Sequence, residues 1–150
     1  DGGVRPIAVG NTLRRLAAKG ALRPLARTLG GELQPRQLGF GVPGGCEAAV
    51  HAVRRYSGDV VGRRVLLKLD MRNAFNTMRR DVFLRAARDR MPGLYHIAWQ
   101  AYSQPSVLMY GREMISSATG IQQGDPMGPT LFCLGVDDMV RSVSSELNLW

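Results

Sequence analysis

The spacing of apolar and polar residues predicts a chain built mainly of helices. Apolar side chains recur at helical intervals at about residues 47–56, 79–91, 94–102 and 127–147. A further helix is expected to begin near Asn11 or Thr12, both of which suit a helix cap. Gly20 and Pro24 fall within that first helix, so we expect it to bend or split there.

Extended segments are predicted in three places. Residues 4–9 suit a short strand, and residues 107–110 and 114–115 flank Gly111-Arg112 as in a two-stranded hairpin. Within residues 64–70, Lys68 interrupts an apolar run, which predicts a buried strand that delivers Asp70 to its end. Residues 30–45 contain six glycines and two prolines, which indicates an irregular crossing segment.

Helices and strands are thus mixed without the strict alternation of a doubly wound sheet, and the predicted fold class is α+β. A length of 150 residues, 45% of them hydrophobic, suits one compact domain. The sequence starts at Asp1 without a methionine and ends on the apolar pair Leu149-Trp150. We therefore expect both ends to be cuts through a longer chain.

Composition narrows the partners and the compartment. The formal net charge is +8 and the isoelectric point is about 10.5, which favours a polyanionic partner such as nucleic acid. The alternative, that the charge serves only solubility, stays open. Cys46 and Cys133 lie far apart with no CxxC motif, so neither a zinc site nor a disulfide is expected. Because no secretory signal or membrane span is visible, we expect an intracellular protein, nuclear or cytoplasmic.

Three short motifs carry candidate chemistry. Asp70, at the end of its predicted strand, offers a carboxylate of the kind that holds magnesium, although a single carboxylate is more often a turn or cap residue. Gly124 allows a close backbone approach to a ligand, and Asp125-Pro126 suits the entry to the helix that follows. Arg5 offers a planar guanidinium suited to phosphate oxygens.

Together, in this order and spacing, these motifs resemble conserved blocks of reverse transcriptases, most closely the non-LTR retrotransposon type. The blocks are Arg5-Pro6-Ile7, then Leu67-Lys68-Leu69-Asp70-Met71-Arg72-Asn73-Ala74-Phe75-Asn76, then Gly120-Ile121-Gln122-Gln123-Gly124-Asp125-Pro126-Met127-Gly128-Pro129. The resemblance covers nearly the whole chain. It implies a partial reverse transcriptase domain over residues 1–150, with about 1–60 in fingers and palm and about 61–150 in the palm of a right-hand polymerase.

The resemblance also implies roles for particular residues. Asp70 and the backbone carbonyl of Met71 would bind metal, as part of a site for two Mg²⁺ ions in which Mn²⁺ is a possible substitute. Phe75 would lie under the sugar of the incoming deoxynucleoside triphosphate and exclude ribonucleotides.

Further implied roles concern the triphosphate and the nucleic acids. Arg5 would contact the triphosphate, and Gln123 with Gly124 would line the nucleotide pocket. Gln37, in the loop of residues 37–41, would contact nucleic acid. The implied partners are an RNA template, a DNA primer and deoxynucleoside triphosphates, joined by nucleotidyl transfer to the primer 3′-hydroxyl.

Two-metal chemistry needs carboxylates from separate segments. In the family the others follow the long helix in an aromatic-x-Asp-Asp hairpin, and we expect this chain to stop just before it and to be inactive alone. Asp137-Asp138 falls inside the helical pattern of residues 127–147, so we expect this pair on a solvated helix face and not at the metal site.

Two other functions remain open. Residues 39–44 match the G-x-G-x-x-G pattern of dinucleotide-binding enzymes, with Asp59 20 residues after Gly39. That pattern requires a preceding strand, whereas residues 32–38 are polar and contain Pro35. The other alternative is a non-catalytic nucleic-acid-binding remnant, which the basic charge also suits.

Overall fold

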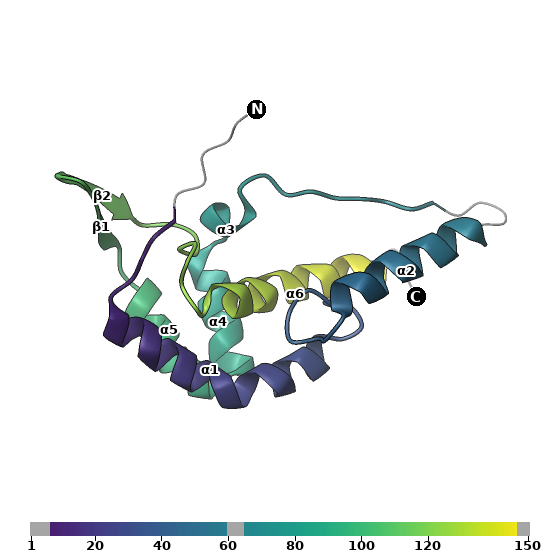
Figure 1. Cartoon of the computed structure of the whole chain (residues 1–150), viewed down its shortest axis with the longest axis horizontal. Helices are drawn as coiled ribbons and strands as arrows, with labels where there is room; N and C mark the ends of the chain where they lie inside the picture. The colour runs from purple at the N-terminus through teal and green to yellow at the C-terminus, as the bar shows by residue number, and fades with distance from the viewer. Residues whose placement is uncertain (1–6, 60–64, 147–150) are drawn as a thin grey trace.

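The computed structural model describes residues 7–59 and 65–146. Helices dominate it, and one antiparallel hairpin is the sheet of the described residues, so the α+β class is confirmed at that level. In chain order the elements are α1 (Thr12–Leu33), α2 (Gly45–Gly58), α3 (Ala74–Thr77), α4 (Arg80–Arg90), α5 (Pro92–Tyr102), β1 (Ser106–Tyr110), β2 (Glu113–Ser117) and α6 (Gly128–Glu146). Figure 1 shows α1, α4, α5 and α6 gathered together while the hairpin projects away from them.

The core lies where α4 packs on α5 and α6, and where α1 packs on α5 and α6. Phe83 of α4, Leu94 of α5 and Leu131 of α6 are fully buried there. The Phe83 ring meets the Tyr102 ring edge-on, with centroids 5.4 Å apart. The helical periodicity of the sequence thus predicted α4, α5 and α6 correctly, because these helices bury their apolar residues against one another and against α1.

Helix α1 begins as predicted but ends later. The Asn11 side chain accepts a hydrogen bond from the Leu13 backbone N–H at 2.8 Å, which caps the helix. Pro24 lies inside the helix without ending it, and Figure 1 shows α1 curving along its length. The helix continues to Leu33, so the prediction of an irregular segment from residue 30 was wrong at its start. Burial of Leu29 and Leu33 explains the extension, because it offsets the low helix propensity of the glycines between them.

The buried strand predicted at residues 64–70 is absent from the described part of that segment. Residues 65–70 form no ladder, and the side chains of Leu67 and Leu69 are 71% and 75% exposed. A strand needs a hydrogen-bonded neighbour, and no described segment pairs with this one. Figure 1 shows the stretch running back to α3 from near the outer end of α2. Residues 7–9 likewise form no strand, and residues 4–6 lie outside the described residues.

The hairpin prediction is confirmed. Strands β1 and β2 pair antiparallel with Leu108 opposite Ile115, and Gly111 supplies the positive φ of 62° in the turn. Among the described helices, none combines the length and apolar character required to cross a membrane.

Candidate functional site

The structure brings parts of all three sequence blocks to one loop, residues 118–127. The Ala8 backbone N–H donates a hydrogen bond to the Gln123 carbonyl at 2.7 Å, and the Ile121 N–H donates to the Phe75 carbonyl at 2.7 Å. Ala8 follows the first block closely, and Phe75 belongs to the second. Arg5 itself lies outside the described residues. Segments separated by up to about a hundred residues therefore meet at the loop, as a shared site requires.

Gly124 occupies a position that only glycine fits well. Its φ is +102°, and a Cβ there would lie 2.9 Å from the Ala8 carbonyl oxygen and 3.3 Å from Cγ2 of Ile7. The close backbone approach predicted for Gly124 is thus present, but the neighbour in this structure is the chain's own first segment. The adjacent Gln123 is half-buried.

Phe75 is held on several sides. Its ring stacks on Phe132 of α6, with centroids 4.6 Å apart and an interplanar angle of 9°. A Cβ at Gly128 would lie 3.5 Å from Cε1 of Phe75, and one at Gly120 would clash with the Asn76 carbonyl. The two glycines therefore let the loop and α6 pack closely against the segment that carries Phe75. The ring remains partly exposed.

Asp70 is not presented by a buried strand as predicted, because residues 65–70 are extended and exposed. No hydrogen bond or ion pair joins its side chain to another described residue. Met71 follows it and is 48% exposed. An exposed carboxylate next to a backbone carbonyl suits a hard cation as a partial set of oxygen ligands. The described residues contain no group of three or more acidic, histidine or cysteine side chains placed to hold a metal, so these two fit as part of a site only.

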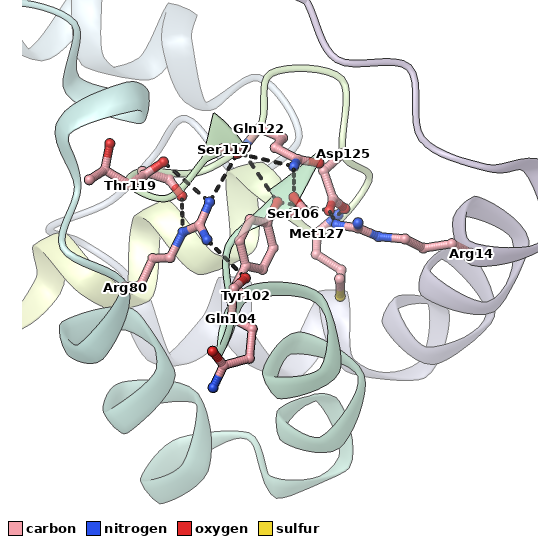
Figure 2. Close-up of polar contacts among 11 residues, drawn as sticks. Arg14, Arg80, Tyr102, Gln104, Ser106, Ser117, Thr119, Gln122, Asp125 and Met127 are labelled. Atoms are coloured by element: carbon pink, nitrogen blue, oxygen red, sulfur yellow. Dashed lines mark hydrogen bonds and ion pairs between the residues drawn. The ribbon is translucent and has the colours of Figure 1, made fainter. Parts of the chain in front are cut away.

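A polar network that the sequence did not reveal fixes the loop (Figure 2). Gln122 is 8% exposed, and its side-chain N–H₂ donates to Oγ of Ser106 at 2.9 Å and to Oγ of Ser117 at 3.2 Å. These bonds tie the start of β1 and the end of β2 to the loop. A buried amide with two partners of this kind orients a loop because each bond lost would leave a polar group unsatisfied.

Tyr102 and Arg14 hold the end of the loop that follows Gly124, through Asp125. The Tyr102 hydroxyl donates to Oδ2 of Asp125 at 2.8 Å and accepts from the Gln122 N–H at 3.3 Å, while Arg14 forms an ion pair with the same Oδ2 at 2.7 Å. Burial, and then the Asp125 carboxylate, raise the pKa of Tyr102, so the hydroxyl stays protonated and can donate. Oδ1 of Asp125 accepts from the Met127 N–H at 2.8 Å in the turn that leads into α6, so Asp125 shapes the entry to the helix from just outside it.

Arg80 of α4 holds the start of the loop, before Gln123. Its guanidinium donates to the carbonyls of Gly120, Thr119 and Gln104 at 3.0, 3.3 and 3.3 Å, and to Oγ of Ser117 at 3.0 Å. Burial lowers the pKa of Arg80, but a guanidinium remains charged at any physiological pH. Nothing in the local sequence marked Arg80 or Tyr102, because their partners lie far along the chain.

Asp137 corrects a prediction. It was expected on a solvated face of the helix, but the residue is 3% exposed and pairs with Arg36, Arg90 and Arg141 at 3.1, 2.8 and 2.7 Å. Burial alone would raise the pKa of Asp137, yet hydrogen bonds from Arg141 and Arg36 and the charge of Arg90 outweigh it and lower the pKa. The sequence missed this because α6 is covered on more than its apolar stripe. Asp138 is exposed, as predicted.

The segment between α1 and α2 does not support a dinucleotide site. It follows helix α1 where the G-x-G-x-x-G fingerprint requires a strand. A Cβ at Gly45 would clash with the Leu38 carbonyl, so close chain packing accounts for that glycine. Gln37 lies in the same segment, where its side-chain oxygen accepts from the Gly39 N–H at 2.7 Å. Its predicted contact with nucleic acid stays a prediction.

Comparison with known proteins gives one match. The family model described as reverse transcriptase (RNA-dependent DNA polymerase) matches residues 1–149. Neither the curated proteins nor the solved structures contain a match.

Proposed function

Since this chain belongs to the reverse transcriptase family, we propose that it forms part of the active site of an RNA-directed DNA polymerase that transfers deoxynucleotides to a primer 3′-hydroxyl. The observation that carries the proposal is the meeting of the three blocks at residues 118–127, where Ala8 bonds to Gln123 and Ile121 bonds to Phe75. An active site for templated synthesis must bring a nucleotide pocket and a metal-binding carboxylate together from separate segments. The non-LTR type and the division into palm and fingers are part of the proposal.

Asp70 is proposed as a ligand for one or both of two Mg²⁺ ions, with the Met71 carbonyl beside it. Support comes from its exposed carboxylate, which has no partner among the described residues and so loses no interaction on binding a cation. When bound, the ions would supply activation of the attacking hydroxyl and stabilisation of the leaving pyrophosphate. The remaining carboxylates are proposed to come from an aromatic-x-Asp-Asp segment of a longer polypeptide, without which this chain would be inactive.

Phe75, Gln123, Gly124 and Arg5 are proposed to form the nucleotide pocket. The Phe75 ring suits a steric gate because Phe132 supports one face while part of the ring stays exposed. A rigid ring can reject one additional hydroxyl group, whereas a mobile ring would move aside. The positive φ of Gly124 shapes the turn beside Gln123, and the Arg5 guanidinium matches phosphate oxygens.

The test is extension of a DNA primer on an RNA template by the full-length polypeptide that contains this chain. We expect extension that requires Mg²⁺ and deoxynucleoside triphosphates, and a loss of at least about a thousandfold in Asp70→Ala. Asp138→Ala is the matched control, because Asp138 is also exposed and is proposed to have no catalytic role. Equal rates for wild type and Asp70→Ala would overturn the metal role.

A non-catalytic nucleic-acid-binding protein is the second candidate, and the net charge of +8 favours it. It predicts RNA binding that weakens with salt and no extension under any condition. The same assay therefore separates the two: binding without extension by the full-length protein would support this candidate.

A further inference from the structure

The loop of residues 118–127 is fastened on both sides of the Gln123-Gly124 pair. Arg80 holds the side before the pair through the carbonyls of Thr119 and Gly120. Asp125 holds the side after it through Arg14 and the Met127 N–H. The pair therefore sits at the middle of a loop whose two ends are tied to different helices.

One hydroxyl group joins the two ends. The backbone of residues 122–125 forms a tight turn in which the Asp125 N–H donates to the Gln122 carbonyl at 3.2 Å. The Tyr102 hydroxyl spans the same turn, because it accepts from the Gln122 N–H and donates to the Asp125 carboxylate. Residues 123 and 124 are the two central residues of that turn. One side chain from α5 thus bridges the two ends of the turn, whose centre also bonds to the Ala8 N–H through the Gln123 carbonyl.

The ring of Tyr102 is itself fixed. Arg14 and Arg80 lie with their guanidinium carbons 5.5 and 5.3 Å from the ring centroid, and Figure 2 shows them reaching it from opposite sides. The Phe83 ring packs nearly perpendicular to the Tyr102 ring, and Tyr102 is 1% exposed. A ring held in this way places its hydroxyl with little freedom. A phenylalanine would keep the packing and both cation contacts and would lose only the hydroxyl.

We infer that Tyr102 and Asp125 are positioning residues that hold the Gln123-Gly124 turn in the geometry that binds the incoming deoxynucleoside triphosphate. The inference rests on the proposed function. It makes Tyr102 a determinant of nucleotide affinity, although Tyr102 lies on α5 and not in the loop. A tyrosine with a merely structural role would use its hydroxyl for stability alone. A positioning tyrosine changes nucleotide binding when only its hydroxyl is removed.

The experiment compares Tyr102→Phe with wild type in the full-length protein by steady-state primer extension on an RNA template. Loss of a hydrogen bond to a charged group is expected to raise the KM for the deoxynucleotide about tenfold while kcat changes less than about threefold. Tyr95→Phe is the matched control, since it makes the same change on the same helix and Tyr95 has no side-chain hydrogen bond among the described residues. Its KM should equal that of wild type.

Asp125→Asn and the double variant complete the test. Because Tyr102 and Asp125 share one bond, while the Tyr102 hydroxyl also accepts from the Gln122 N–H, the double variant should raise KM by less than the two single effects combined. A KM for Tyr102→Phe within twofold of wild type, or additive effects in the double variant, would contradict the positioning role. Absence of extension by wild type would instead contradict the proposed function, and the inference would fall with it.

Discussion

Asp137 and Asp70 lie in two regions of the molecule with opposite surroundings for a carboxylate. Asp137 lies in the packed helical region, 3% exposed, with three arginines around it. Asp70 lies on the extended stretch of residues 65–70, exposed and without a side-chain partner among the described residues. The sequence predicted the opposite surroundings for each, with a buried strand leading to Asp70 and a solvated helix face around Asp137.

The difference shows which carboxylate still has oxygens available to bind a cation. A buried carboxylate must be paired, because leaving water costs several kcal/mol per ion, and once paired its oxygens are occupied. Asp137 is therefore committed to holding α6 to Arg36 and to Arg90 of α4. Asp70 has no such commitment, so its oxygens can accept a cation. Of these two aspartates, the one proposed for catalysis contributes less to packing.

The largest effect on stability is expected at Asp137. Asp137→Asn would leave three arginine side chains without their shared carboxylate, and the free energy of unfolding should fall by about 3 kcal/mol. Urea unfolding followed by far-UV circular dichroism measures this. Asp138→Asn, one position along the same helix and exposed, is the control and should unfold like wild type. Equal midpoints for Asp137→Asn and wild type would mean that the ion pairs contribute nothing.

The next effect concerns Phe75. Its ring stacks on Phe132 of the packed helical region, whereas no described side chain bonds to Asp70. Phe75→Val should raise ribonucleotide incorporation relative to deoxynucleotide incorporation by about a hundredfold, because the smaller side chain admits a 2′-hydroxyl. Parallel primer extension with each nucleotide type gives the ratio. Val107→Ala, at a 64% exposed residue of the hairpin, is a control whose ratio should not move. Unchanged sugar selectivity in Phe75→Val would contradict the proposed steric role of Phe75.

The helices and the hairpin could be predicted because their signals are local. An apolar residue every three or four positions marks a helix face, and Gly111 between two apolar runs marks a turn. The strand expected at residues 64–70 could not be judged in this way, since a strand depends on a partner that its own residues do not specify. An apolar run states only that burial would be favourable, and not that a neighbour is there to provide it.

The polar networks could not be predicted because their members are distant in sequence. Arg14 and Asp125 are 111 positions apart, and Arg36 and Asp137 are 101 apart. Asp125 was predicted at the entry to the long helix, which is a local feature, and it lies in the turn that leads into α6. Its bonds to Arg14 and Tyr102 had no such signal. The roles of Asp70, Phe75 and Gln123 came from the family resemblance and remain proposals.

A smaller effect follows from pH. The pKa of Asp137 is lowered in the folded chain, so the group stabilises the fold above its unfolded pKa, near 3.9, and that contribution is lost as pH falls through the folded value. The difference in unfolding free energy between wild type and Asp137→Asn should therefore be constant from about pH 5 to 7 and shrink below about pH 4. Unfolding midpoints measured across this range test it. A difference that grows on acidification would have the wrong sign.

The smallest effect is expected at Asp70. Asp70→Asn should change the free energy of unfolding by less than about 0.5 kcal/mol, because no described residue bonds to its side chain. The same urea titration gives the value. A loss as large as that of Asp137→Asn would show that Asp70 has a structural partner, and the contrast between the two regions would disappear.

The most direct measurement of the central claim is the metal dependence of Asp70→Cys in the full-length protein. A thiolate binds Mg²⁺ poorly and softer ions well. RNA-templated extension should therefore fall by at least about a thousandfold with Mg²⁺ and recover at least about tenfold when Mn²⁺ or Cd²⁺ replaces it, a recovery that Asp70→Ala lacks. Extension by Asp70→Cys with Mg²⁺ at the wild-type rate, or an equal loss with every ion, would contradict the claim that this carboxylate binds the catalytic metal.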